Sequence, residues 1–503
     1  MRKISKYILS IDQGTTGTTA ILWDREGLAR ARAYREHKQY YPQPGWVEHD
    51  PDEIWGNVLL TTGDALKEAG SPASDIVAIG ITNQRETLVF WDRRTGKAIT
   101  RAIVWQCRRT AEMCRHLKEA GHEENVRRKT GLLLDPYFSG TKLRWALENI
   151  PEVNSASEEG YLACGTVDSY LLFRLTGGTI FATDYSNASR TLLYNIHNLK
   201  WDPELLELFK VPDLILPEVM PSSNLFGETD PEVFFNSRIS VGGIAGDQQA
   251  ALFGQACYSP GMTKNTYGTG SFLLMNTGVK AVTSQRGLLT TIAWGVDKRV
   301  EYALEGSIFI TGAAVQWLRD GLGLIGKSAD LENLARQVEG NEGVYLVPAF
   351  AGLGAPHWDP YARGLLIGIT GGTTKAHLAR AVVEAMAYQT RDVLEVMHRE
   401  AGLPLKELRV DGGASVMDML LQFQADITGM VVRRAATFDT TALGAAYLAG
   451  LASGFWSNIE ELAGRWKQSA VFEPQMEEAA REALYAGWQK AVKRSLGWAE
   501  DEE

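Results

Sequence analysis

Two short loops rich in glycine and threonine are the segments of this chain best suited to chemistry. The first is Asp12-Gln13-Gly14-Thr15-Thr16 and the second is Tyr267-Gly268-Thr269-Gly270. Backbone N–H groups and threonine hydroxyls in such loops can donate hydrogen bonds to the oxygens of a polyphosphate. A carboxylate such as Asp12, at the end of an apolar run, can hold Mg²⁺ beside these phosphates, directly or through water. The two loops therefore predict a nucleotide-using enzyme, and we expect a kinase.

The residues around both loops predict β-hairpins in two related halves. Apolar residues at 7–11 and 19–23 flank the first loop, and residues 272–275 follow the second. Gly14 and Gly268 are 254 positions apart, about half the chain, which indicates that each half offers one loop to a shared cleft. A plain turn is the alternative for either loop alone, because Gly14 and Gly17 would suit any hairpin.

Asp247 is the candidate for acceptor chemistry. It lies in Gly246-Asp247-Gln248-Gln249, where the predicted strand 239–245 runs into a predicted helix. One interpretation is a helix N-cap, since aspartate accepts backbone N–H bonds there. The flanking glycine and two glutamines favour a base that takes the proton of an alcohol as the γ-phosphoryl group leaves ATP. The transition state is loose, so an ordinary aspartate suffices if it is well placed. We also expect Asp247 to join Asp12 as a metal ligand.

Three further segments contain groups suited to a small polyol. Arg85 and Glu86 stand side by side between two apolar runs and could donate to and accept from adjacent hydroxyls. Trp105 and Phe272 could cover the carbon backbone, and Tyr137 could supply one more hydroxyl. The alternatives are a surface ion pair for Arg85 and Glu86, and core packing for the aromatic residues.

Composition sets the broad class of protein. A chain of 503 residues exceeds what one hydrophobic core usually serves, so we predict two domains, 1–254 and 255–503. The net charge is −10 and no dense Lys/Arg run occurs, which argues against a nucleic-acid partner. The four cysteines lack metal-ligand spacing, which favours reduced thiols in the cytoplasm and no structural zinc. Asp12 ends the first apolar run too early for a signal peptide, and no run is long enough to span a membrane.

Strands and helices are predicted to alternate in both halves, as in layered α/β domains. We expect strands at 76–81, 88–91, 239–245, 344–348 and 408–410, with 88–91 as the hairpin partner of 76–81, and a long helix at 375–399. Residues 321–328 match the P-loop pattern GxxxxGK[ST]. A P-loop follows a buried strand, however, and residues 312–320 have helical spacing. We therefore interpret 321–328 as a connection between helices, with Ser328 capping the second one.

These motifs together resemble the FGGY family of carbohydrate kinases, in particular its glycerol-phosphorylating members, over essentially the whole chain. The resemblance includes residues 44–51, 84–87, 105–109, 135–142, 246–249 and 265–270. The phosphate loops and Asp247 are shared with other sugar kinases, whereas the segments with Arg85, Glu86 and Trp105 resemble the glycerol-specific members.

The resemblance implies an α/β fold of two actin-like (RNase H-like) domains with an ATP-binding cleft between them. It implies ATP- and Mg²⁺-dependent phosphorylation of glycerol to sn-glycerol 3-phosphate, with Asp247 as base. The implied glycerol contacts are Arg85, Glu86, Trp105, Tyr137, Asp247, Gln248 and Phe272. The implied nucleotide contacts are Thr15, Thr16, Gly17, Thr269, Gly312, Gln316 and Gly413, with glycines at 412–413 allowing close approach of adenosine. We further expect a homo-oligomer, either a dimer or a tetramer.

The chain departs from the family at three places. Gly17-Thr18-Thr19 replaces a Ser-Ser-Arg type sequence, so an arginine contact to phosphate is absent, and Met417 stands where some members offer Asn to adenine. Residues 235–238 replace the Gly-Gly-Thr-Arg loop that binds a sugar bisphosphate in some bacterial members. Two alternative functions remain at this point: a kinase for a longer sugar such as a pentulose, and an ATP-driven conformational protein of the actin or chaperone type.

Overall fold

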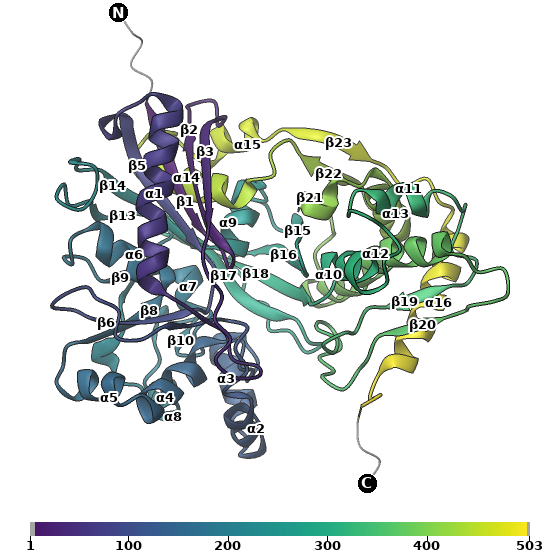
Figure 1. The fold of residues 1–503 in the computed structure, drawn as a ribbon, viewed down its shortest axis with the longest axis horizontal. Helices are drawn as coiled ribbons and strands as arrows, with labels where there is room; N and C mark the ends of the chain where they lie inside the picture. Colours follow the sequence, from purple (N-terminus) through teal and green to yellow (C-terminus); the bar gives the residue numbers. More distant parts are fainter. Residues whose placement is uncertain (1–5, 500–503) are drawn as a thin grey trace, which may run out of the picture.

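One mixed β-sheet runs through both lobes of the molecule. The computed structural model describes residues 6–499, and Figure 1 shows an N-terminal lobe beside a C-terminal lobe. The strand order is β23 (Gln468–Phe472), β22 (Val432–Ala435), β21 (Leu408–Gly412), β15 (Thr263–Tyr267), β16 (Ser271–Gly278), β18 (Arg299–Ile308), β17 (Leu289–Val296), β13 (Ser223–Glu228), β14 (Ser240–Gly246), β5 (Ile76–Asn83), β1 (Tyr7–Gln13), β2 (Gly17–Trp23) and β3 (Ala29–Glu36). The predicted α/β class is confirmed.

Both predicted hairpins are present in this sheet. Strands β1 and β2 pair antiparallel up to Gln13 and Thr18, and β15 and β16 pair antiparallel up to Tyr267 and Ser271. Every residue of β2 is buried, which explains why both faces of this strand are rich in apolar side chains. The loops with the phosphate-binding pattern therefore form the tips of two hairpins in different halves of one sheet.

The two halves of the sheet meet at a narrow joint. Strands β13 and β17 are neighbours, but their parallel pairing has a single registered pair, Ser223 with Val296. By comparison, β17 and β18 pair over most of their length. The continuity of the sheet between the lobes therefore depends on very few backbone hydrogen bonds.

For residues 88–91 the predicted strand is confirmed, but the predicted hairpin pairing with residues 76–81 was wrong. A strand is present, β6 (Leu88–Asp92), but it does not pair with β5. It belongs to a separate sheet with the order β4 (Glu48–His49), β7 (Ala102–Ile103), β6 and β8 (Leu162–Thr166). The turn at 84–87 redirects the chain out of the large sheet, so the apolar run that follows has different partners.

Helices cover both faces of the large sheet in each lobe (Figure 1). The helices of the described residues are α1 (Pro51–Ala69), α2 (Ala111–Glu119), α3 (Glu123–Thr130), α4 (Ser139–Asn149), α5 (Pro151–Glu158), α6 (Val167–Leu175), α7 (Tyr185–Ala188), α8 (Pro203–Leu208), α9 (Asp247–Gly254), α10 (Gly312–Gln316), α11 (Asp330–Ala335), α12 (Lys375–Ala401), α13 (Asp418–Thr428), α14 (Thr440–Ala452), α15 (Ile459–Arg465) and α16 (Glu478–Ser495). Of these, α4 and α5 pack on the small sheet instead. The predicted long helix corresponds to α12, which begins at a Thr374/His377 capping box and ends at the left-handed Gly402.

Helices α9 and α14 pack at very short range. A Cβ added to Gly444 would lie 1.8 Å from the carbonyl oxygen of Ala250, and one added to Gly254 would lie 2.0 Å from that of Thr440. Neither position tolerates a side chain unless a backbone moves. This contact fixes α9, the helix that begins at Asp247, against α14 of the second half of the chain.

Residues 321–328 do not form a P-loop, as predicted. A π-helical turn, Trp317–Gly321, precedes them, and α11 follows. The prediction that Ser328 caps α11 was wrong. The residue before this helix is Ala329, which makes no side-chain cap, and Asp330 Oδ2 instead accepts the backbone N–H of Lys327.

Two further observations concern the chain as a whole. All four cysteines are buried and form no disulfide. Among the helices of residues 6–499, none combines the length and apolar character that crossing a bilayer requires.

Candidate functional site

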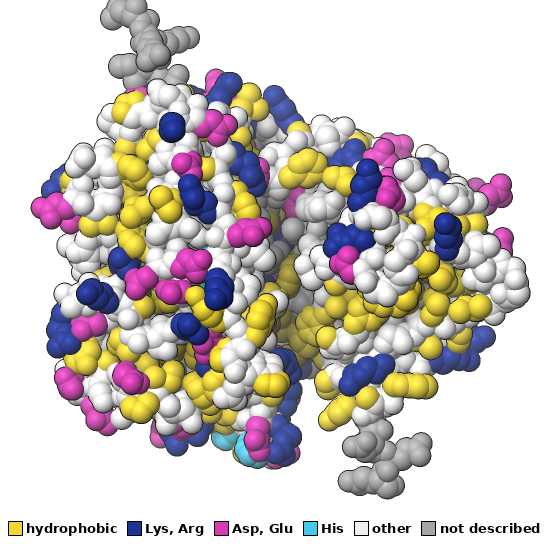
Figure 2. Space-filling model, viewed as in Figure 1, with side chains coloured by type: hydrophobic (Ala, Val, Ile, Leu, Met, Phe, Trp, Pro, Cys, Tyr) yellow, Lys and Arg dark blue, Asp and Glu magenta, His cyan; other side chains and the backbone are white. Residues whose placement is uncertain are grey.

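The candidate site lies where three adjacent parallel strands end. Strand β5 is paired with β1 on one side and β14 on the other, and Asn83 is aligned with both Gln13 and Gly246. The first phosphate loop, the Arg85-Glu86 turn and Asp247 follow directly after these aligned positions. Segments far apart in sequence are thereby brought to one edge of the sheet, which is the usual place for ligands in open α/β sheets. Figure 2 shows the molecule hollowed between the two lobes.

The turn that carries Arg85 and Glu86 is tight and buried. Thr87 N donates to the carbonyl oxygen of Arg85 at 2.7 Å, and Glu86 has a left-handed φ of 61°. A non-glycine residue in this conformation is strained, and such strain is common at functional sites. The Arg85 and Glu86 side chains are only 2% and 1% exposed. The alternative of a surface ion pair is therefore excluded.

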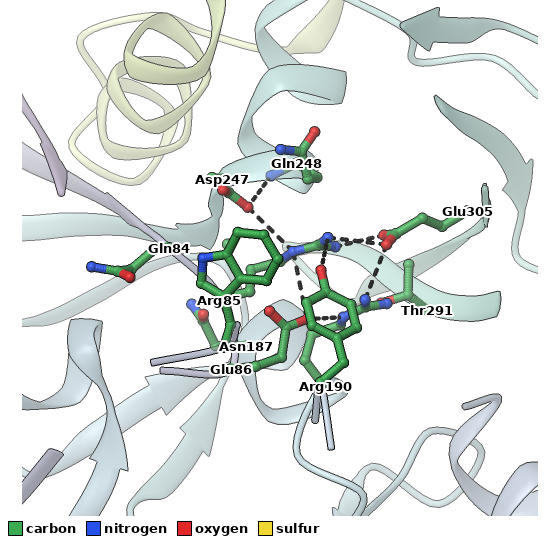
Figure 3. A network of polar contacts seen from close by, with 12 residues as sticks. Gln84, Arg85, Glu86, Asn187, Arg190, Asp247, Gln248, Thr291 and Glu305 are labelled. Carbon is green, nitrogen blue, oxygen red and sulfur yellow. Dashed lines mark hydrogen bonds and ion pairs between the residues drawn. The ribbon is translucent and has the colours of Figure 1, made fainter. Parts of the chain in front are cut away.

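Arg85 is the centre of a polar network (Figure 3). Its Nη1 donates to Glu305 Oε2 at 2.5 Å and to Gln249 Oε1 at 3.2 Å. Its Nη2 donates to Glu305 Oε1 at 3.0 Å and to Tyr137 Oη at 3.2 Å. Its Nε lies 3.2 Å from Asp247 Oδ1. The structure therefore brings the predicted residues Arg85, Tyr137 and Asp247 together.

Asp247 is the first residue of α9, and it does not act as the N-cap. The cap position is Gly246, and no side chain caps this helix. Asp247 Oδ1 instead accepts the N–H of Gln248 at 2.7 Å. Burial raises the pKa of Asp247, although the charges of Arg85 and Lys264 oppose this rise. Its side chain is 30% exposed, so an acceptor in the cleft could reach the carboxylate.

The aromatic candidates surround this network. The rings of Trp105 and Tyr137 lie edge to face with centroids 5.5 Å apart. The Arg85 guanidinium carbon is 5.9 Å from the centroid of the Phe272 ring. Trp105 Nε1 also donates to Thr15 Oγ1 at 2.9 Å. This bond joins a candidate for the acceptor site directly to the first phosphate loop.

The first phosphate loop is closed by its own backbone. Gly14 N donates to the carbonyl oxygen of Gly17 at 2.9 Å. A Cβ at Gly17 would lie 2.5 Å from the carbonyl oxygen of Arg35, so only glycine fits there. The Thr16 side chain is exposed at the tip of this hairpin.

The candidate nucleotide residues of the other half gather around the second loop. Thr269 O accepts N–H bonds from Thr311 and Ala313, and Gly312 N donates to Gly268 O at 3.1 Å. This places the start of α10, which ends at Gln316, against the loop. Strand β21 pairs with β15 so that Gly412 lies opposite Tyr267, which brings the exposed Gly413 to the same edge. Thr269, Gly312 and Gly413 therefore share one side of the second loop, and Gln316 lies one helical turn from Gly312.

Asp12 is in a strongly anionic position. Burial, followed by the negative charges of Asp247 and Asp439, raises its pKa to about 7, against the opposing effect of Arg32. A divalent cation would relieve this accumulation of charge, and carboxylates are the ligands that Mg²⁺ prefers. Within residues 6–499, no three His, Cys, Asp or Glu side chains form a metal-binding group. The neighbouring carboxylates of Asp12 and Asp247 fit a Mg²⁺ ion that would take its other ligands from phosphate and water.

Three charged residues of this region were missed in the sequence. Arg190 and Glu305 belong to the Arg85 network, and the buried Lys264 donates to Gln248 Oε1 at 2.5 Å and Thr266 Oγ1 at 2.9 Å. Burial lowers the pKa of Lys264 to about 8. Lys264 is the single charge of β15, and Glu305 lies in the fully buried part of β18; buried charges of this kind are almost always paired. A charge in a strand that is otherwise expected to be buried could have identified Glu305 and Lys264, whereas no feature of the sequence marks Arg190.

The fold and this site define a sugar-kinase type of phosphotransferase. The N-terminal domain model of the FGGY family of carbohydrate kinases matches residues 7–254, and the C-terminal domain model matches residues 263–453. The chain belongs to the FGGY family of carbohydrate kinases.

Glycerol kinases are prominent among its relatives. The chain is 58% identical to "Glycerol kinase 2" of Thermotoga maritima over 493 residues, which cover 98% of this chain and 99% of the relative. It is 57% identical to a glycerol kinase of Xanthomonas campestris, with coverage of 98% and 99%.

Solved structures agree with these relationships. The crystal structure of Plasmodium falciparum glycerol kinase with ADP matches with a TM-score of 0.91 at 36% identity and covers 98% of each chain. A ligand-bound xylulose kinase from Lactobacillus acidophilus matches with a TM-score of 0.86 at 24% identity, covering 98% of this chain and 99% of that one. This second match supports the fold alone. The expected two-domain actin-like kinase fold is confirmed.

Proposed function

We propose that this chain transfers the γ-phosphoryl group of ATP to a primary hydroxyl of glycerol, giving sn-glycerol 3-phosphate, with Asp247 as the general base. The observation that carries this proposal is the alignment of three strand ends. It places a phosphate loop, a buried Arg-Glu pair and an accessible carboxylate at one edge of the sheet. The identity of more than half of all residues to glycerol kinases supports the choice of acceptor.

Glycerol would be held by hydrogen-bond donors and acceptors on its hydroxyls and by aromatic rings against its carbon chain. Arg85 can donate to one hydroxyl and Glu86 can accept from another, with Tyr137 and Gln248 as further polar contacts. Trp105 and Phe272 lie beside these groups and would cover the three-carbon chain. A buried Arg and Glu left without hydroxyl partners would be costly, so the site favours a polyol over an apolar analogue.

In the chemical step, the acceptor oxygen bonds to the γ-phosphorus as the bond from that phosphorus to the β,γ-bridging oxygen breaks. The proton of the hydroxyl passes to Asp247, and ADP leaves. Because Oδ1 is held by Gln248 N–H and faces Arg85, Oδ2 is the oxygen free to take this proton. In a loose transition state Asp247 need not be a strong base, so its placement beside the hydroxyl matters more than the exact value of its pKa.

The nucleotide would lie between the two loops. We assign phosphate contacts to Thr15, Thr16, Gly17 and Thr269, and nucleotide contacts to Gly312, Gln316 and Gly413. Asp12 and Asp247 would hold Mg²⁺, which when bound neutralises charge on the phosphate oxygens. Closure of the two lobes around glycerol would expel water and limit ATP hydrolysis.

The proposal also covers the domain division, the location and the oligomeric state of the protein. The chain divides into domains 1–254 and 255–503, which the separate ranges of the two family models support. The enzyme acts in the cytoplasm, where ATP is available and where four unpaired cysteines are kept reduced. It assembles as a dimer or a tetramer.

The test is ADP release from ATP and Mg²⁺ with and without glycerol, against xylulose, ribulose and gluconate at equal concentration. Strong stimulation by glycerol alone is expected. Preference for a pentulose would assign the site to a longer sugar. Hydrolysis that does not depend on any acceptor would favour an ATP-driven conformational protein and refute the proposal.

A further inference from the structure

Four buried charges surround the candidate acceptor site, and only two of them have a proposed role so far. Arg85, Glu86, Arg190 and Glu305 have side chains that are 2%, 1%, 0% and 0% exposed. We propose that Glu305 and Arg190 are positioning residues for the acceptor, which fix the orientations of Arg85 and Glu86 respectively. This inference rests on the proposed phosphorylation of a polyol at that site.

Glu305 determines which edge of Arg85 faces the acceptor. Its two carboxylate oxygens bind Nη1 and Nη2 of Arg85 at 2.5 and 3.0 Å, a two-pronged contact that fixes a planar guanidinium in one orientation. The other Nη donors are directed to Gln249 and Tyr137. The remaining N–H, on Nε, lies 3.2 Å from Asp247 Oδ1 and 3.8 Å from Glu86 Oε1. Glu305 thus presents the Nε edge of Arg85 between the base and the second acceptor-binding carboxylate.

Arg190 has the matching effect on Glu86. Its Nε donates to Glu86 Oε1 at 2.6 Å and its Nη2 donates to Glu305 Oε1 at 3.0 Å. The guanidinium also lies over the rings of Tyr137 and Phe138, 5.6 and 5.2 Å from their centroids. Among the described residues, none makes a hydrogen bond to Glu86 Oε2. Arg190 therefore occupies one oxygen of Glu86 and leaves the other for a hydroxyl.

The cluster joins three separate parts of the fold. Glu305 lies in β18, Arg190 follows α7, and Arg85 and Glu86 form the strained turn after β5 (Figure 3). Buried ion clusters rarely stabilise a fold more than packed apolar side chains would. Two positive and two negative charges that pair across three elements are better explained by the need to hold two charged groups in fixed orientations. Replacing an outer member should therefore disturb acceptor binding more than nucleotide binding.

The test compares Glu305→Gln with wild type by steady-state kinetics in both substrates. Glutamine keeps the shape but loses the second acceptor oxygen and the charge. We expect KM for glycerol to rise about 10- to 100-fold, since small misplacement of reacting groups has effects of this size, with KM for ATP changed less than about threefold. Arg190→Lys, which keeps the charge but cannot bridge Glu86 and Glu305 in the same way, should give an intermediate rise.

The matched control is Asp202→Asn, which breaks the buried ion pair of Asp202 with Lys129, away from the Arg85 network. It should lower thermal stability without changing KM for glycerol. A double-mutant cycle gives a second readout: in an Arg85→Ala background, Glu305→Gln should have little further effect on kcat/KM for glycerol.

A merely structural role predicts a different result. An unchanged KM for glycerol in Glu305→Gln, an equal rise in both KM values, or fully additive effects in the cycle would each overturn the inference. If Glu305→Gln does not fold, the same comparison is made with Arg190→Lys. Failure of the wild type to use glycerol would refute the proposed function instead, and the comparison would then use the acceptor that the wild type does phosphorylate.

Discussion

Replacing Asp247 with Asn changes the chemistry of one group with almost no change in volume. One oxygen position, Oδ1, faces two donors, the N–H of Gln248 and Nε of Arg85. The amide must place its own oxygen there, because an NH₂ group would face both donors. The NH₂ is then left at the position of Oδ2, pointing toward the acceptor. It can donate a hydrogen bond to the hydroxyl but cannot take its proton.

The expected loss follows from the value of a general base. Positioned proton transfer contributes about 10²- to 10⁴-fold to a rate, or roughly 3 to 5 kcal/mol of activation free energy. We therefore expect kcat to fall by this factor in Asp247→Asn. Glycerol affinity should change only a few-fold, because Arg85 keeps its contact with Glu305 and Glu86 keeps its contact with Arg190.

The assay combines kcat from coupled ADP detection with glycerol binding by calorimetry. Asp50→Asn is the matched control, because Asp50 is a helix N-cap whose side chain accepts the N–H groups of Asp52 and Glu53 within its own helix and is no part of the Arg85 network. A Mg²⁺ titration distinguishes loss of a base from loss of a metal ligand, since excess Mg²⁺ should not restore a missing base. Near-normal turnover in Asp247→Asn would show that the assignment of the base is wrong.

Three other predictions test the fold. Lys327→Ala should leave KM for ATP nearly unchanged, and a collapse of nucleotide binding would revive the P-loop interpretation. Gly444→Ala should lower the free energy of unfolding by about 1–3 kcal/mol in urea, because its Cβ overlaps the Ala250 carbonyl, whereas Gly464→Ala, with nothing within 4 Å, should not destabilise. Burial raises the pKa of Asp168 from 3.8 to about 7, so the folded protein holds a proton that the unfolded chain releases. The free energy of unfolding should therefore fall as the pH rises from about 4 to 7, by up to about 1.4 kcal/mol per pH unit. Asp168→Asn should flatten this slope, and an unchanged slope would contradict that pKa.

Local pattern was enough to predict the elements that carry the site. Apolar runs on both sides of residues 14–16 and after residues 268–270 predicted two hairpins, and both are present. The stripe of apolar residues in 375–399 predicted α12 to within two residues of its end. These features depend on side-chain periodicity and turn residues, which the sequence states directly.

The local sequence pattern did not predict which distant strands and charged residues pair with one another. The run at 88–91 predicted a strand, but its partners are β7 and β8 because the strained turn at Glu86 leads it away from β5. Likewise, Arg85 and Glu86 were identified as an adjacent pair, whereas Arg190 and Glu305 lie 104 and 220 residues from their respective partners Glu86 and Arg85. Periodicity indicates which face of a strand is buried, and it does not indicate which distant charge lies opposite.

The single pair that joins β13 to β17 has a consequence for the energetics of closing the cleft. A rotation of one half of the sheet against the other need not break a long ladder, since Ser223 and Val296 are the only registered pair at the joint among the described residues. The backbone cost is then on the order of one hydrogen bond, about 1 kcal/mol. The backbone pairing at this joint would therefore consume little of the binding energy of the substrates. Faster amide exchange at this joint than within the β17–β18 ladder would be the signature of such a low-cost pivot.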